Sequence, residues 1–92
     1  MKIFAVFLFM QDEEKSRVHR PEHLAYLDVK RAEGRIFANG RFVDGWGGMV
    51  LYWANDVSEV EKLAIEDPYV TTGARRYEIH EWDMVPGRLS LE

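Results

Sequence analysis

The 92-residue chain is predicted to form one α+β domain in which the elements follow the order βαββαβ. Two long apolar runs are typical of buried strands, and two further segments carry the start and stop signals of helices. A last segment, in which polar and apolar residues alternate, is typical of a strand with one buried face. A chain of this length supports a single core, so residues 1–92 are expected to be one domain.

The first predicted element is a strand from Ile3 to Met10, because this run is apolar throughout and rich in aromatic and β-branched residues. Without polar alternation, the strand is expected to be covered on both faces. The run is much shorter than the ~20 residues of a membrane-spanning helix, and charged residues follow it where a signal peptide would be cleaved. Residues 11–17 are then expected to form a charged loop.

Pro21 is predicted to begin the first helix, because its missing N–H costs nothing at the first helical position. The helix is expected to run to about Glu33, with Gly34 as its C-terminal cap. Its inward-facing residues would be Leu24, Leu27 and Ala32.

A short strand is predicted after this helix, with a kink at Asn39-Gly40 and a glycine-rich turn from Asp44 to Gly48. Met49–Ala54 is the second long apolar run, and it predicts another strand that is covered on both faces.

The second helix is predicted to begin at Asp56, which has the spacing of a capping box with Glu59. It is expected to stop at Asp67, because Pro68 disfavours helical geometry in the residue before it. Residues 75–82 alternate between polar and apolar side chains and predict the last strand.

The order βαββαβ is the ferredoxin-like pattern, in which two helices cover one face of an antiparallel sheet. The second face of both apolar strands then needs another cover, and no remaining segment is long enough. We therefore expect a homodimer, or a higher oligomer, in which two sheets pack face to face as a barrel between subunits. Burial of ~500 Å² of apolar surface per subunit would contribute about 12 kcal/mol before the costs of association.

Composition narrows the possible partners. The net charge is -4 and the basic residues are scattered, which argues against a nucleic-acid partner. The absence of cysteine excludes disulfides, thiolate catalysis and zinc-thiolate sites, and suits a cytoplasmic protein. We expect no metal, no cofactor and no membrane partner, and a small molecule as the ligand.

His19 and His23 have the spacing of two metal ligands on one helix face, but a helix that begins at Pro21 would leave His19 outside it. At the third helical position, His23 would meet the positive end of the helix dipole. That position disfavours the imidazolium by ~0.3–1 kcal/mol and leaves the ring able to accept a proton. The alternative from the residues alone is a histidine that only packs in the core.

Asp67 is expected at the C-terminal end of the second helix, where a carboxylate meets the negative end of the dipole. A specific contact often offsets such an unfavourable interaction with the helix dipole. The alternative is that Asp67 only forms a turn, since aspartate is common before proline in turns.

Two motifs carry a family resemblance: "RPEHLAYLDVKRAEGRIFANGRF" and, further along, "DPYVTTG". They resemble the YCII-related domain (YciI-like proteins), and the resemblance extends from "MKIFAVFL" to "EIHEWDMV". It implies a fold similar to muconolactone isomerase and other dimeric α+β barrels. It also implies a pocket in which His23 pairs with Asp67, and activities of a lyase or isomerase type.

The resulting hypothesis is a small cofactor-independent enzyme acting on a small cyclic or aromatic molecule, with His23 and Asp67 as an acid–base dyad. Arg20 would anchor an anionic substrate and Tyr69 would wall the pocket. The hairpin would add Gly40 and Asp44 as further substrate contacts. The alternative is a non-catalytic ligand-binding or interaction module of the same fold. A cofactor-free oxygenase is a third class that no residue favours.

Overall fold

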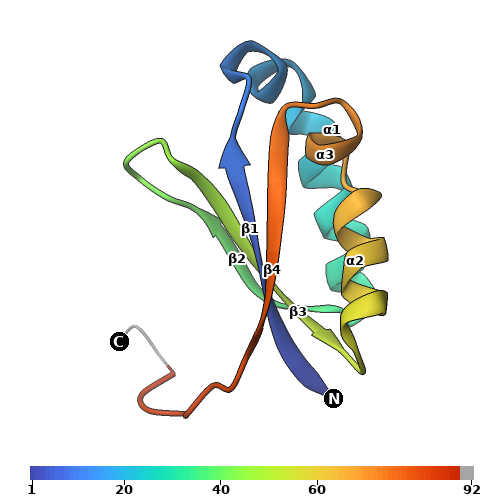
Figure 1. Cartoon of the computed structure of the whole chain (residues 1–92), viewed down its shortest axis with the longest axis vertical. Helices are drawn as coiled ribbons and strands as arrows, with labels where there is room; N and C mark the ends of the chain where they lie inside the picture. The colour runs from blue at the N-terminus through green and yellow to red at the C-terminus, as the bar shows by residue number, and fades with distance from the viewer. Residues whose placement is uncertain (90–92) are drawn as a thin grey trace.

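The computed structural model describes residues 1–89 and contains one four-stranded antiparallel sheet with the strand order β2-β3-β1-β4. The strands are β1 (Lys2–Met10), β2 (Ile36–Arg41), β3 (Gly47–Ala54) and β4 (Arg75–Trp82). The helices are α1 (Glu13–Ala32), α2 (Val57–Ile65) and the short α3 (Pro68–Thr71). All three helices lie on one side of the sheet (Figure 1). The predicted α+β, ferredoxin-like fold is confirmed, and α3 is an addition to it.

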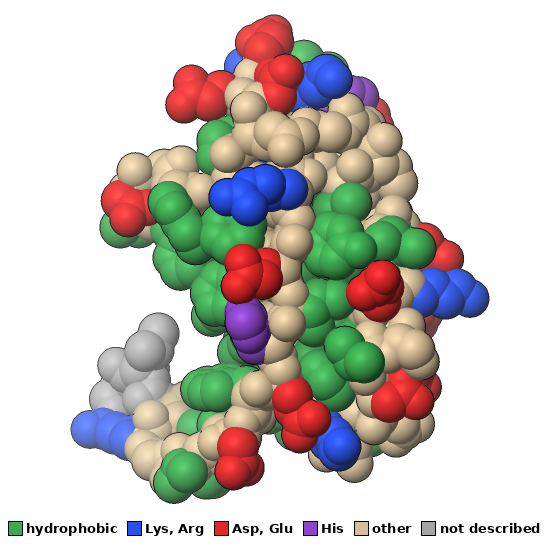
Figure 2. Space-filling model, viewed as in Figure 1, with side chains coloured by type: hydrophobic (Ala, Val, Ile, Leu, Met, Phe, Trp, Pro, Cys, Tyr) green, Lys and Arg blue, Asp and Glu red, His purple; other side chains and the backbone are tan. Residues whose placement is uncertain are grey.

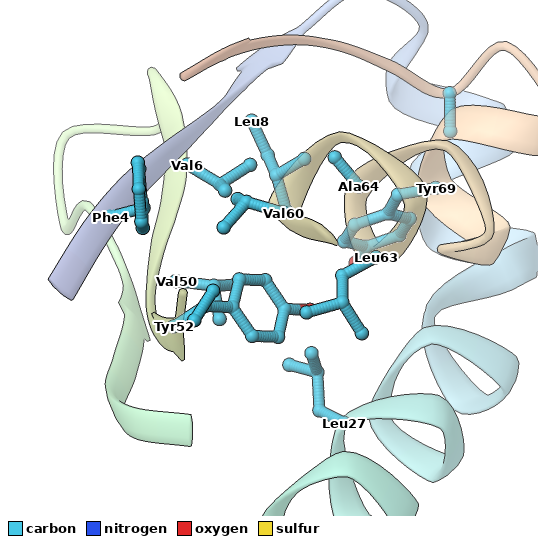
Figure 3. Close-up of a cluster of buried hydrophobic side chains, with 12 residues drawn as sticks. Phe4, Val6, Leu8, Leu27, Val50, Tyr52, Val60, Leu63, Ala64 and Tyr69 are labelled. Carbon is cyan, nitrogen blue, oxygen red and sulfur yellow. The ribbon is translucent and has the colours of Figure 1, made fainter. Parts of the chain in front are cut away.

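The main core lies between the sheet and the helices, and Figure 3 shows its side chains converging. The central strands β1 and β3 direct alternate residues into it, and the buried faces of α1 and α2 close it. Burial of apolar surface is the largest stabilising contribution to such a fold. The buried members with the largest side chains are Phe4, Val6, Leu8, Leu27, Val50, Tyr52, Val60, Leu63 and Tyr69.

The face of the sheet away from the helices, called here the open face, is also apolar. Ile3, Ala5 and Leu51 are buried there. Partly buried hydrophobic residues pack against them, and one of these, Met84, comes from the segment after β4. Figure 2 shows hydrophobic side chains at the surface on this side. Both central strands are therefore apolar on both faces, and residues 1–89 cover the open face only in part.

The first helix differs from the prediction, because α1 begins at Glu13 and residues 13–17 of the predicted loop are helical. Asp12 caps the helix, and its Oδ1 accepts a hydrogen bond of 2.9 Å from the Lys15 amide. Pro21 lies inside the helix, where it is exposed and removes one main-chain hydrogen bond. Figure 1 shows the first turns of α1 crossing the top of the molecule before the helix descends along the sheet. The proline therefore marks a position within the helix rather than its start.

Of the three residues expected to face inward from α1, only Leu27 is buried. Leu24 is 41% exposed and Ala32 is exposed. The buried positions earlier in the helix are Ser16 and His23, so the inward face of α1 is more polar than the prediction had it.

The hairpin between β2 and β3 also differs from the prediction. The register shift lies between Ile36 and Ala38, not at Asn39-Gly40. β3 begins at Gly47, which has a φ of 145° and no room for a side chain, since a Cβ there would lie 2.0 Å from the Leu8 carbonyl oxygen. Glycine is thus what lets β3 pair closely with β1 at this point.

The start of α2 agrees with the predicted capping box. Asp56 Oδ1 accepts from the Glu59 amide at 3.0 Å, and Glu59 in turn accepts from the Asn55 amide at 2.6 Å. Pro68 then occupies the first position of α3, where its missing N–H is tolerated. Within residues 1–89, no helix has the length and the apolar character needed to span a membrane.

Tyr52 is buried in the main core, and its hydroxyl has no hydrogen-bond partner within residues 1–89. We expect Tyr52→Phe to raise the free energy of unfolding by about 1 kcal/mol, because it removes an unsatisfied polar atom. Tyr26→Phe is the matched control, since the Tyr26 hydroxyl donates to the Leu63 carbonyl at 2.8 Å. That variant should lose about 1 kcal/mol. Urea denaturation at pH 7 measures both, and a destabilised Tyr52→Phe protein would contradict the prediction.

The same residue predicts a dependence on alkaline pH. Burial raises the pKa of the Tyr52 phenol above its ordinary value, so the folded state favours the protonated form. The contribution to stability is complete below the ordinary tyrosine pKa of about 10 and is lost as the pH rises further. The stability advantage of Tyr52→Phe over the wild type should therefore grow above about pH 10, as urea denaturation across pH 8–11 would show.

Candidate functional site

His23 and Asp67 meet in the interior, although they come from the middle of α1 and from the turn between α2 and α3. The Nδ1 atom of His23 lies 2.7 Å from Oδ1 and 3.0 Å from Oδ2 of Asp67. The two residues are only 7% and 2% exposed. A carboxylate this deeply buried needs hydrogen-bond donors to offset its lost hydration, and His23 supplies one.

The local backbone holds Asp67 in place. Asp67 is the N-cap of α3, and its Oδ1 also accepts a hydrogen bond of 2.9 Å from the Tyr69 amide. The C-cap of α2 is Glu66. Asp67 follows this cap directly, and its amide donates to the Ala64 carbonyl at 3.2 Å, so it lies at the end of the second helix as predicted. The environment of its carboxylate differs from the prediction, because the carboxylate caps the next helix.

The predicted surroundings of the two histidines are also wrong. Since α1 begins at Glu13, His23 lies well inside the helix, beyond the first turn in which the dipole acts. Asp67, not the helix dipole, is the nearest electrostatic partner of its ring. His19 lies inside α1 too, with Nδ1 3.3 Å from Glu22 Oε1 on the outer surface.

Tyr69 links the pair to a third group. Its ring stacks on the imidazole of His23, with centroids 3.9 Å apart and planes inclined by 14°. The guanidinium of Arg75, at the start of β4, lies 4.4 Å from the centroid of the same ring. Because Tyr69 is 5% exposed and follows the cap residue Asp67 closely, it fixes both neighbours relative to the carboxylate.

A pocket of about 510 Å³ lies beside His23, between α1 and the part of the sheet where β2, β3 and β1 meet. Of the residues that the sequence singled out, it is lined by His23, Arg20, Tyr69 and Gly40, whereas Asp67 lies behind the imidazole. Asp44 is not part of the lining, because it lies in the hairpin turn and accepts a hydrogen bond from the Trp46 amide. The apolar walls are Leu8, Met10, Leu24, Leu27, Met49 and Val50.

Sequence reasoning missed several polar residues of the pocket, above all Ser16 and Arg75. Ser16 was assigned to a loop, so its place on the inner face of α1 was hidden. The position of Arg75 could have been predicted, because alternate residues of a strand share a face. Arg75 alternates with the half-buried Tyr77 and Ile79 in β4, so it faces the helices as they do. Within residues 1–89, no three histidine, aspartate or glutamate side chains come together as metal ligands.

The YCII-related domain matches residues 1–83 of the chain. The chain belongs to the YCII-related domain family. The resemblance in the two motifs is therefore confirmed for almost the whole sequence. A search of curated proteins found no match for this YCII-related domain.

A solved structure similar to this YCII-related domain is 5-chloro-2-hydroxyhydroquinone dehydrochlorinase (TftG) from Burkholderia phenoliruptrix AC1100, in complex with 2,5-dihydroxybenzoquinone. The TM-score is 0.77, the sequences are 19% identical, and the match covers 88% of this chain and 93% of that chain. At this identity the likeness supports the shared fold alone.

We expect Asp67→Ala to lower the free energy of unfolding of this YCII-related domain by about 2–4 kcal/mol. The change removes the cap of α3 and leaves the buried Nδ1 of His23 without its partner. The matched control is Asp44→Ala, which removes an exposed aspartate that also bonds a main-chain amide. It should cost less than about 1 kcal/mol. Urea denaturation measures both variants. Equal losses of unfolding free energy in the two would contradict the prediction that the buried pair stabilises the fold.

Proposed function

We propose that this YCII-related domain is a small cofactor-independent enzyme that moves a proton on a small cyclic or aromatic molecule, with an isomerase- or lyase-like outcome. The observation that carries the proposal is the 2.7 Å hydrogen bond between the buried carboxylate of Asp67 and a histidine that lines a pocket. A base oriented by a buried carboxylate is a recurrent device for proton transfer.

The hydrogen bond determines which nitrogen would react. Nδ1 of His23 donates to Asp67, and Nε2 makes no hydrogen bond within residues 1–89, so Nε2 is available to a substrate. Nε2 would accept a proton from carbon, and Asp67 would stabilise the imidazolium that forms. In an elimination, the electron pair of the C–H bond forms a double bond and expels a leaving group. In an isomerisation, the imidazolium returns the proton to another atom.

The pocket and the structural neighbour both support a small ring as the substrate. The volume of about 510 Å³ and the mostly apolar walls suit a molecule of one or two rings. TftG is named as a dehydrochlorinase of a chlorinated hydroxyhydroquinone. Removal of hydrogen chloride from such a compound is an elimination on a small aromatic molecule. Arg20, Tyr69 and Gly40 would contact the substrate, whereas the position of Asp44 does not support that role.

The test is turnover by His23→Gln on panels of lactones and halogenated phenols. We expect the variant to lose at least ~100-fold in kcat, because it removes the general base but keeps a side chain of similar size. His19→Gln is the matched control, since it changes a histidine of the same helix that does not line the pocket. It should keep full activity.

The alternative function, a non-catalytic binding module, predicts a different result. Compounds would raise the melting temperature of the wild type and of His23→Gln alike, and neither protein would turn them over. Unchanged turnover by His23→Gln would end the proposed mechanism.

We also propose that the protein is a homodimer that joins two open faces. Aromatic side chains gather on this face, where Trp46 packs against Phe9 with centroids 4.5 Å apart and against Phe7 at 6.4 Å. Trp46 and Trp82 remain 50% and 45% exposed. Exposed apolar surface of this kind, next to two buried strands, is typical of an interface between subunits.

Light scattering is expected to give twice the chain mass of 10.8 kDa. Phe7→Asp should shift the protein toward the monomer, because it places a charge in the proposed interface. Val29→Asp is the control, since it places the same charge at an exposed apolar position of α1. A wild-type protein with the mass of one chain would contradict the proposal.

A further inference from the structure

We infer that Arg75 forms an anion-binding subsite in the pocket and that the substrate is a ring compound carrying a carboxylate. The inference deepens the proposed function and rests on it only in taking the pocket as the place of reaction.

The side chain of Arg75 is held in a defined orientation. Its Nε donates a hydrogen bond of 3.0 Å to Oγ of Ser16, which is 4% exposed and lies 3.4 Å from the Ala74 carbonyl oxygen. The planar guanidinium lies over the Tyr69 ring. With Nε in use, the edge that carries the two terminal nitrogens is the part left for a ligand. That edge matches the two oxygens of a carboxylate.

No carboxylate of the described part of the chain forms an ion pair with this guanidinium, although the buried Asp67 acts on it at longer range. Arg75 forms no ion pair within residues 1–89, and the same holds for Arg20 and Arg41, which also line the pocket. By contrast, Arg17 at the pocket edge pairs with Glu14. Burial lowers the pKa of Arg75, and the nearby Asp67 opposes this effect only in part. An anionic ligand would oppose it further.

The pocket as a whole is cationic in a chain of net charge -4. Its lining includes four arginines and one acidic residue: Arg17, Arg20, Arg41, Arg75 and Glu13. Positive side chains that converge on a concave surface attract and retain anions. The excess of positive charge is therefore a property of this site and not of the protein surface in general.

The subsite lies across the Tyr69 ring from the proposed base. The Tyr69 ring contacts both the imidazole of His23 and the guanidinium of Arg75. A carboxylate bound by Arg75 would hold the attached ring beside His23, in the part of the pocket with apolar walls. The same guanidinium would favour the negative charge that develops on the substrate when His23 takes a proton. Arg75 is therefore both an anchor and an electrostatic contributor.

Binding of two probes of equal shape tests the inference without any turnover. Benzoate and benzamide differ in charge but hardly in size, and titration followed by amide NMR gives a Kd for each. We expect the wild type to bind benzoate at least tenfold more tightly than benzamide. Arg75→Gln should weaken benzoate binding at least tenfold and leave benzamide unchanged. Lys62→Gln is the matched control, because it removes one positive charge from a separate cleft that shares no residue with the pocket.

Two further variants separate a subsite from a loss of folding. Arg75→Lys keeps the charge but loses the fork and the bond to Ser16, so benzoate affinity should fall to an intermediate value. Ser16→Ala keeps Arg75 but releases its orientation, and it should weaken benzoate several-fold with an unchanged fold in the amide spectrum. Equal affinities for benzoate and benzamide in the wild type, or unchanged benzoate affinity in all three variants, would overturn the inference. Tighter binding of inorganic phosphate than of benzoate would overturn the carboxylate assignment.

The failure of this inference can be distinguished from failure of the proposed function. His23→Gln is expected to keep the preference for benzoate over benzamide, because Arg75 is intact. Charge-selective binding without turnover of any compound would support the anion subsite and contradict the proposed enzymatic function. Turnover of neutral ring compounds, without selective binding of benzoate, would support the proposed enzymatic function and contradict the anion subsite.

Discussion

The buried carboxylate of Asp67 is the group on which the arrangement of the site depends. With 2% of its surface exposed, it must find donors within the protein, and it finds them in the Nδ1 of His23 and the amide of Tyr69. The first bond joins α1 to the start of α3, and the second lies within that start. They also place the Tyr69 ring between the imidazole and the guanidinium of Arg75. The need of the Asp67 carboxylate for hydrogen-bond donors thereby helps to orient three side chains of the pocket, which are His23, Tyr69 and Arg75.

The structural and the chemical roles of this pair are compatible. Satisfying Asp67 uses one nitrogen of the imidazole and leaves the other for a ligand. The arginines gathered around the same pocket concentrate positive charge in an acidic protein. A base that is held by a buried carboxylate, beside a cationic anchor, suits proton transfer on an anionic ring compound. We propose a separate role for the open face of the sheet, which is to join two subunits.

The sequence predicted the fold better than it predicted the site. Apolar runs reveal β1 and β3 because burial on both faces leaves no room for polar residues. Pro21 misled the prediction, because a proline can be accommodated within a helix that is capped further upstream, here by Asp12. That error concealed Ser16. Its contact with Arg75 joins residues 59 positions apart, and no local pattern encodes such a contact.

The most direct test of this account is the protonation pattern of the His23 ring, observed by long-range ¹H–¹⁵N NMR at a pH at which the ring is neutral. His23→Gln assigns the signals. The account predicts a proton on Nδ1, shifted downfield by its bond to Asp67, and an unprotonated Nε2 whose signal responds to pocket ligands. A proton on Nε2, with Nδ1 bare and no change in the ring signals of an Asp67→Asn protein, would contradict it.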